Sequence, residues 1–204
     1  IEILHRCRHG RKVVGITGTN GKSTTTALVK HILNARKQSA VMGGNIGTPV
    51  LALDLAQDIE TIVLEISSYQ MDLCPSFQPD IAVLLNITPD HIDRHGSFEG
   101  YAAAKERIFK GDALAVIGID DAASQAIYNR IAHDGRTVIP ISTTTQPGGG
   151  VYINNGTLVD AMGEGDTHRQ PHAIGSVTHL PNLLGAHNLQ NLCAAYAVCY
   201  HLDI

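Results

Sequence analysis

A glycine-rich hexapeptide near the start of the chain, Gly18-Thr-Asn-Gly-Lys-Ser23, most constrains what the chain can fold into. It follows a short β-branched run, Lys12–Thr17, and precedes Lys22–Arg36, which has helical composition and period. A strand, a glycine-rich loop and a helix in this order direct backbone N–H groups and a helix N-terminus at one point, where they can bind phosphate. The segment therefore predicts a phosphate-binding unit of an α/β protein.

Each residue type in this loop has a chemical role in nucleotide binding. Gly18 and Gly21 let the backbone approach phosphate oxygens closely. Lys22 supplies a positive charge to the β- and γ-phosphates, and the Ser23 hydroxyl can ligate Mg²⁺. The full pattern G-x-x-x-x-G-K-[ST] has glycine where this chain has Ile16, so the match is partial. The alternative is a glycine-rich turn with an incidental lysine; the flanking strand and helix favour nucleotide binding.

The order of strand and helix repeats along the chain, which predicts a mostly parallel sheet flanked by helices, as in P-loop NTPases. The expected strands are Lys12–Thr17, Ser39–Met42, Thr61–Ile66, Ile81–Ile87, Ala113–Ile117 and Arg136–Ile141, and the expected helices include Phe98–Phe109, Asp121–His133 and His187–Leu202. Ile81–Ile87 is almost wholly apolar, which is typical of a central parallel strand. Val151–Asn154 and Thr157–Val159 flank the turn signal Asn155-Gly156 and predict a small antiparallel hairpin.

Composition bounds the number of domains and the class of partner. The 204 residues, 44% of them hydrophobic, suffice for one core. A formal net charge of -4 gives no basic stripe, which argues against a nucleic-acid partner. Four cysteines without C-x-x-C spacing and no long apolar run predict a cytoplasmic protein that has neither disulfides nor a membrane span.

Acidic and imidazole groups follow two of the expected strands, at the edge where ligands collect in an open parallel sheet. Glu65 ends one strand, and we expect its carboxylate to reach Mg²⁺ at the phosphates. Asn86–His95 follows the next strand and contains two acids, two imidazoles and an arginine, which favours a second metal or substrate site over a plain polar loop. Lys105, by contrast, is typical of a solvent-facing lysine on a helix.

Several blocks of the sequence resemble the Mur ligase family. Gly18–Ser23 is similar to the G-T-N-G-K-[ST] loop of the Mur ligases and of the related folylpolyglutamate synthetases. Leu64–Gln70, with the sequence LEISSYQ, resembles the L-E-x-S-S-[FY]-Q signature of the D-glutamate-adding Mur ligases. Further similar blocks follow in the family's order, at Gly43–Gly47, Asn86–His95, Ala103–Lys105 and Gly185–Asn191. The resemblance covers nearly the whole chain and implies the family's central, ATP-binding domain.

The resemblance also implies which residues bind which ligand. ATP would contact Gly18, Thr19, Asn20, Gly21, Lys22, Ser23 and Thr24 through its phosphates, and Asn188 and Asn191 near the adenosine. One Mg²⁺ would bind Ser23 and Glu65, and a second would bind His91 and a carbamylated Lys105. Asn45, Ser67, Gln70 and His91 would lie near the muramoyl-alanine substrate. The catalytic residues would be Lys22, His91 and Lys105.

The implied reaction is ATP-dependent amide formation between UDP-N-acetylmuramoyl-L-alanine and D-glutamate through an acyl phosphate, a step in peptidoglycan precursor synthesis. Residues 1–204 would form one central domain of a monomeric enzyme, with 1–11 as an interdomain linker. The N-terminal UDP-binding and C-terminal amino-acid-binding domains would be absent, so this domain alone would bind Mg-ATP weakly and not ligate. Two alternatives stay open: another Mur ligase or a folylpolyglutamate synthetase, and a nucleotide-binding regulatory module.

Overall fold

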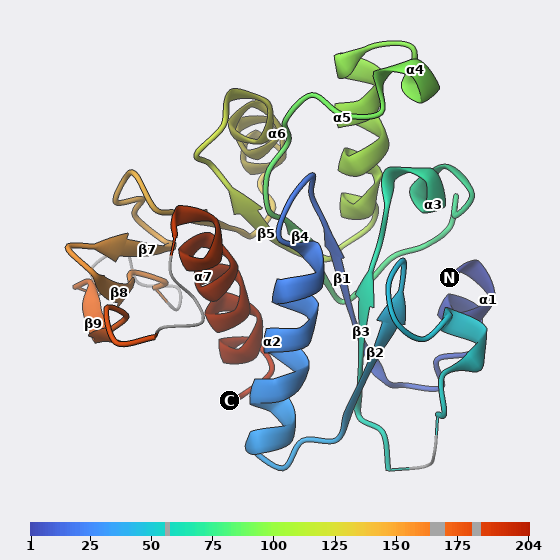
Figure 1. The fold of residues 1–204 in the computed structure, drawn as a ribbon, viewed down its shortest axis with the longest axis horizontal. Helices are drawn as coiled ribbons and strands as arrows, with labels where there is room; N and C mark the ends of the chain where they lie inside the picture. The colour runs from blue at the N-terminus through green and yellow to red at the C-terminus, as the bar shows by residue number, and fades with distance from the viewer. Residues whose placement is uncertain (56–57, 164–169, 181–184) are drawn as a thin grey trace.

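A nine-stranded sheet flanked by helices makes up the computed structural model, which describes residues 1–55, 58–163, 170–180 and 185–204 (Figure 1). The strands are β1 (Lys12–Thr17), β2 (Ala40–Gly44), β3 (Thr61–Glu65), β4 (Ile81–Leu84), β5 (Leu114–Gly118), β6 (Val138–Ser142), β7 (Val151–Asn154), β8 (Thr157–Asp160) and β9 (His172–Ser176). β1 to β7 run parallel, and β8 and β9 pair antiparallel. The expected α/β class is confirmed.

The strand order, β2-β3-β1-β4-β5-β6-β7-β8-β9, determines which loops meet. β1 lies between β3 and β4, and every residue of β4 is buried, as its apolar sequence predicts. Because neighbouring parallel strands end at the same edge, the phosphate loop after β1 adjoins Glu65 at the end of β3 and the polar segment after β4.

Helices cover both faces of the sheet. α2 (Lys22–Ala35) and α7 (Ala186–Tyr200) lie side by side on one face, where Val29 and Cys193 pack in one core with Val14 of β1 (Figure 1). The core on the other face includes Val13 and Tyr101, since successive strand residues point to opposite faces. The remaining helices are α1 (Glu2–Arg6), η1 (Val50–Ala52), α3 (Ser68–Asp72), α4 (Ile92–His95), α5 (Phe98–Glu106), η2 (Arg107–Phe109) and α6 (Ala122–His133).

The predicted hairpin is present and belongs to the main sheet. β7 and β8 pair antiparallel around Asn155 and Gly156, whose φ angles of 47° and 72° are those of a two-residue hairpin turn. β7 also pairs in parallel with β6, so the hairpin extends the sheet. The sequence did not predict β9, which is exposed throughout, or the short helices α1, α3 and α4. α1 lies in the expected linker and buries Leu4.

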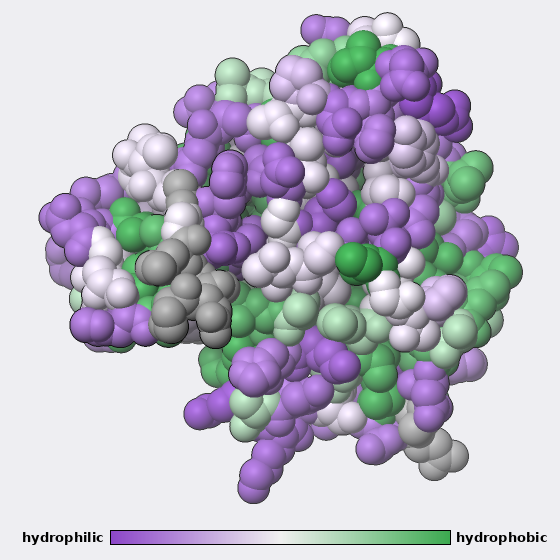
Figure 2. Space-filling model, in the orientation of Figure 1, coloured by the Kyte–Doolittle hydropathy of each residue, from purple (hydrophilic) through white to green (hydrophobic). Residues whose placement is uncertain are grey.

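The four cysteines differ in their exposure. All four cysteines are free; Cys7 is exposed, whereas Cys74, Cys193 and Cys199 are buried. Among the described residues, no helix combines the length and apolarity needed to cross a bilayer. Hydrophilic residues cover most of the face shown in Figure 2, and the hydrophobic ones form separate patches.

Candidate nucleotide and metal site

The phosphate loop is closely packed against its supports. Gly18 and Gly21 have φ angles of 152° and 85°, which favour glycine. A Cβ atom on Gly21 would lie 2.2 Å from Oδ1 of Asn191, in α7, and one on Gly18 would lie 3.1 Å from Cβ of Leu85. Both glycines are therefore needed for the shape of the loop, as well as for access by phosphate.

The segment after β4 supports the phosphate loop through hydrogen bonds. The backbone N–H of Thr19 donates to the carbonyl of Asn86 at 2.9 Å, and the N–H of Asn20 donates to the Asn86 side-chain carbonyl at 2.8 Å. The Thr19 hydroxyl accepts from the N–H of Thr88 at 3.0 Å and lies 3.2 Å from the hydroxyl of Tyr101. Sequence reasoning missed Asn86 and Tyr101 as supports, because their partners are 66 and 82 residues away.

Lys22 lies where a phosphate-binding lysine is expected. Its ammonium donates to the carbonyls of Gly18 and Thr19, at 3.0 and 2.8 Å. Burial lowers the pKa of Lys22, and the negative charges of Glu65 and Asp90 partly offset this effect. Ser23 and Thr24 are exposed in the first turn of α2, where their hydroxyls are accessible to a ligand.

Glu65 is buried, and only one of its two carboxylate oxygens has a hydrogen-bond partner. Its side chain is 2% exposed, and Oε1 accepts a hydrogen bond of 3.0 Å from the Asn45 side-chain amide. Oε2 is buried without a hydrogen-bond partner. A buried carboxylate oxygen that lacks a donor is destabilising unless a cation or a donor satisfies it. The donor set fits Mg²⁺, a cation that prefers carboxylate oxygens.

Lys105 is buried, which contradicts the solvent-facing position that its helical context alone indicates. It is 1% exposed, and its ammonium donates to the carbonyl of Gly18 at 2.8 Å and lies 4.6 Å from the centre of the Tyr101 ring. Burial lowers the pKa of Lys105 to about 7, with a further contribution from the positive charge of Lys22, against the opposing effect of Asp90.

His91 and Lys105 both lie beside Tyr101, whose ring centroid is 6.3 Å from that of His91 and 4.6 Å from the Lys105 ammonium. His91 precedes α4 with a φ of 50°, and its Nε2 is 3.5 Å from a carboxylate oxygen of Asp90. Its ring also lies against Tyr69, with 5.0 Å between centroids. Across the described part of the chain, no three His, Cys, Asp or Glu side chains form a metal-binding group.

Ser67 and Gln70 bond to each other at the start of α3. The Ser67 hydroxyl accepts from the N–H of Gln70 at 3.3 Å, and the Gln70 side-chain oxygen accepts from the N–H of Ser67 at 3.0 Å. This reciprocal arrangement is a capping box, and the spacing S-x-x-Q was readable from the sequence. The structure thus gives these two residues a structural role beside the predicted substrate role.

His95 supports the same helix, which the sequence did not indicate. Its Nε2 is 3.0 Å from the hydroxyl of Ser68, which is buried, and its Nδ1 is 3.8 Å from Asp72. Asp72 also pairs with Arg107 at 2.5 Å. Of the two imidazoles in the Asn86–His95 segment, His91 is therefore exposed at the site, whereas His95 joins α3 to α4.

A cavity of about 270 Å³ lies beside the loop. It is lined by Asn20, Asn86, Thr88, Asp120, Asp121, Thr143, Thr144, His187 and Gln190. Asp120 accepts hydrogen bonds from Ser142, Thr143 and Thr144, which together hold its pKa below the usual value against the opposing effect of burial. Of the expected adenosine residues, Asn191 lies against Gly21. The side-chain nitrogen of Asn191 is 3.4 Å from the side-chain oxygen of Asn188.

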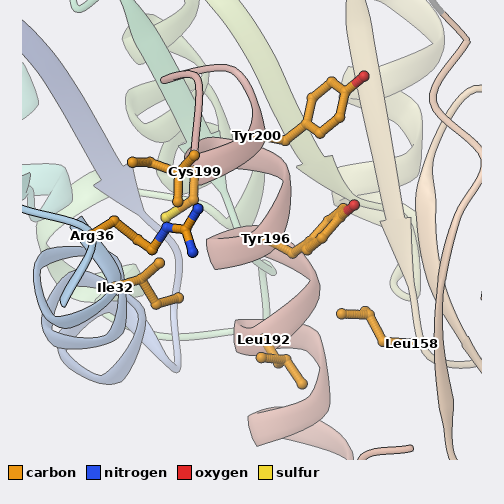
Figure 3. Close-up of a pocket in the computed structure, with 8 residues that line it drawn as sticks. Ile32, Arg36, Leu158, Leu192, Tyr196, Cys199 and Tyr200 are labelled. Atoms are coloured by element: carbon orange, nitrogen blue, oxygen red, sulfur yellow. The ribbon is translucent and has the colours of Figure 1, made fainter. Parts of the chain in front are cut away.

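A larger, mostly apolar cavity of about 380 Å³ lies among α2, α7 and β8. Its lining residues are Ile32 of α2 and Arg36 just after it, Leu158 of β8, Leu192, Tyr196, Cys199 and Tyr200 of α7, and Ile204 (Figure 3). Ile32 and Arg36 lie at the C-terminal end of α2, whereas the phosphate loop lies at the start of that helix.

Comparison with known proteins identifies the family. Residues 16–199 match the Mur ligase middle domain. The chain belongs to the Mur ligase family. The UDP-N-acetylmuramoylalanine–D-glutamate ligase of Rhodospirillum rubrum is 49% identical over 203 residues, which are 98% of this chain and 42% of that ligase. The enzyme of the same name from Caulobacter vibrioides is 48% identical over 198 residues, 95% of this chain and 41% of that enzyme. The chain thus spans about two fifths of these Mur ligases.

Solved Mur ligase structures share the fold. A UDP-N-acetylmuramoyl-L-alanyl-D-glutamate–2,6-diaminopimelate ligase superimposes with a TM-score of 0.76 at 24% identity, over 98% of this chain and 46% of that one. The MurF ligase of Thermotoga maritima, solved in complex with ADP, gives a TM-score of 0.63 at 23% identity, over 95% of this chain and 46% of that one.

Proposed function

We propose that this chain is the ATP-binding domain of a D-glutamate-adding Mur ligase. The observation that carries the proposal is the buried, unpartnered oxygen of Glu65 close to Lys22 and the phosphate loop. A carboxylate and a lysine beside such a loop are the groups that bind Mg-ATP. The run Leu64–Gln70, the names of the relatives and the ADP bound to a MurF ligase of the same fold support this function.

The proposed reaction has two displacements. The carboxylate of UDP-N-acetylmuramoyl-L-alanine attacks the γ-phosphorus of ATP, and ADP leaves. The amino group of D-glutamate then attacks the acyl carbon of the acyl phosphate and loses a proton, and inorganic phosphate leaves. The first step brings two anions together, so it needs fixed positive charge. Lys22 supplies that charge, and Mg²⁺ held by Glu65 and Ser23 would add to it.

Lys105 is proposed to hold the second Mg²⁺ as a carbamate, together with His91. An ammonium would repel the cation, whereas a lysine whose pKa is about 7 is partly neutral at physiological pH and can take up CO₂. The product carries an anionic oxygen. Asn45 orients Glu65 from the second coordination shell, and Asn188 and Asn191 are proposed to contact the adenosine.

The proposal is tested by phosphate release from a protein of the relatives' full length. Release that requires both UDP-N-acetylmuramoyl-L-alanine and D-glutamate would support it. Release with another amino acid would indicate a different Mur ligase or a folylpolyglutamate synthetase, and release without any acceptor would indicate the regulatory module. The chain described here is expected to bind Mg-ATP weakly. It is expected not to ligate, because UDP and D-glutamate are proposed to dock on other domains. We propose that the full enzyme is a cytoplasmic monomer.

A further inference from the structure

Asn86 satisfies both backbone polar groups of Asn20 in the phosphate loop. Its side-chain oxygen accepts from the N–H of Asn20 at 2.8 Å, and its side-chain nitrogen donates to the carbonyl of Asn20 at 3.2 Å. Asn86 is 9% exposed, so water is a poor substitute for these bonds. One side chain therefore fixes the backbone of Asn20 on both sides.

The same side chain reaches α7. The Asn86 nitrogen also donates to the side-chain oxygen of Gln190 at 2.9 Å, in a buried contact between residues 104 positions apart. Gln190 is 5% exposed, and it packs closely on β5, since a Cβ atom on Gly118 would lie 2.8 Å from its nitrogen. The next residue, Asn191, lies against Gly21. Asn86 thus bonds the phosphate loop to the helix turn that carries Asn191.

We propose that Asn86 and Gln190 are positioning residues. They fix the phosphate loop relative to α7, so that the groups that bind the phosphates and those that bind the nucleoside keep a constant distance and orientation. The inference rests on the proposed nucleotide binding. Both residues also line the cavity beside the loop, and the proposed role rests on the hydrogen bond between them rather than on a contact with the ligand. Ligand-binding groups are effective when buried hydrogen bonds hold them in place, and loss of such a support typically weakens affinity.

Two probes separate the roles of the two residues. Binding of Mg-ADP and of Mg-tripolyphosphate is measured by calorimetry on the chain described here. Asn86→Leu removes the support of Asn20, and we expect it to lower the affinity for both probes on the order of tenfold. Gln190→Met keeps the bonds to Asn20 and removes the link to α7. We expect it to weaken the binding of Mg-ADP by a similar factor and to change the affinity for Mg-tripolyphosphate by no more than about twofold.

Ile131→Ala is the matched control for stability, because it opens the core at the far end of α6 and leaves both positioning residues intact. It should leave the affinity for both probes unchanged although it lowers the melting temperature. If Asn86→Leu does not fold, Gln190→Met alone still tests the inference through the ratio of the two affinities.

The outcomes are distinguishable. If the original chain binds neither probe, the proposed nucleotide binding fails. If it binds both, and the ratio of affinities in Gln190→Met equals that of the original chain, the positioning role is wrong. An affinity loss in Ile131→Ala as large as that in the positioning variants would also overturn the inference, because stability alone would explain it.

Discussion

The ammonium of Lys105 donates a hydrogen bond of 2.8 Å to the carbonyl of Gly18, 87 residues earlier in the chain. A charge on α5 is thereby bonded to the first residue of the phosphate loop. The charge state of Lys105 and the environment of the loop are consequently linked, and this linkage can be measured through stability.

The first prediction concerns the pH dependence of folding. The pKa of Lys105 is about 7 in the folded chain, below the ordinary value of 10.5 expected when the chain is unfolded. Between these pH values the unfolded chain binds a proton that the folded chain has lost, so this residue makes the free energy of unfolding rise with pH. The contribution approaches about 1.4 kcal/mol per pH unit. Lys105→Met should remove it.

Urea unfolding between pH 6 and pH 9 checks this, because the range spans the folded pKa of about 7 and stays below the unfolded value of 10.5. Lys110→Met is the control, since Lys110 is exposed shortly after α5. The original chain and Lys110→Met should gain stability relative to Lys105→Met as the pH rises above about 7. Parallel curves for all three proteins would refute the assigned pKa.

The second prediction separates metal binding from folding at Glu65. Glu65→Gln retains an oxygen for Asn45 and removes the unpaired buried charge, so the free energy of unfolding should stay the same or rise. The factor by which Mg²⁺ increases the affinity for ADP should fall about tenfold or more. Glu60→Gln, an exposed change just before the same strand, should alter neither property. Unchanged Mg²⁺ dependence in Glu65→Gln would remove this residue from the metal site.

The third prediction tests which role Ser67 has. Ser67→Ala removes the N-cap of α3 and should lower the free energy of unfolding by about 1 kcal/mol. Ser67→Asp retains an acceptor for the N–H of Gln70 and should recover most of that loss. The full-length forms distinguish the roles: activity that returns with the cap indicates a structural role. Activity that stays low in Ser67→Asp, at normal stability, indicates a contact with substrate.

The fourth prediction concerns His95 and Ser68. His95→Phe retains the ring contacts with Tyr69 and Tyr101 and removes the partner of the buried Ser68 hydroxyl. We expect a loss of about 1–3 kcal/mol in the free energy of unfolding. In a double-mutant cycle, Ser68→Ala should recover part of this loss, with a coupling on the order of 1 kcal/mol. Additive effects would show that the two side chains do not interact.

The sequence was most informative where one segment determines its own structure. β1 and α2 begin at the predicted residues, because a β-branched run and a glycine-ended loop act locally. Glu65 lies at its predicted strand end for the same reason. The capping box at Ser67 was equally local. Helix α3 was nevertheless not predicted, because its five residues are too few to show a helical hydrophobic period.

The sequence was least informative where burial depends on distant segments. The environment of Lys105 comes from Gly18 and from the Tyr101 ring, and no helical periodicity shows the first of these. The support that Asn86 gives to Asn20 likewise requires β1 and β4 to be neighbours, which follows from strand order. Residue types at strand ends therefore indicated the site, whereas their hydrogen bonds required the three-dimensional fold.

The distribution of the four thiols has a practical consequence. Burial raises the pKa of Cys74, and it raises the pKa of Cys193 and Cys199 to about 12, so these side chains are protonated and shielded from alkylating reagents. Cys7 is exposed directly after α1. A maleimide fluorophore should therefore attach at Cys7 without any cysteine being removed. A dye there would lie within residues 1–11, the segment proposed to be an interdomain linker, where its emission could report hinge motion.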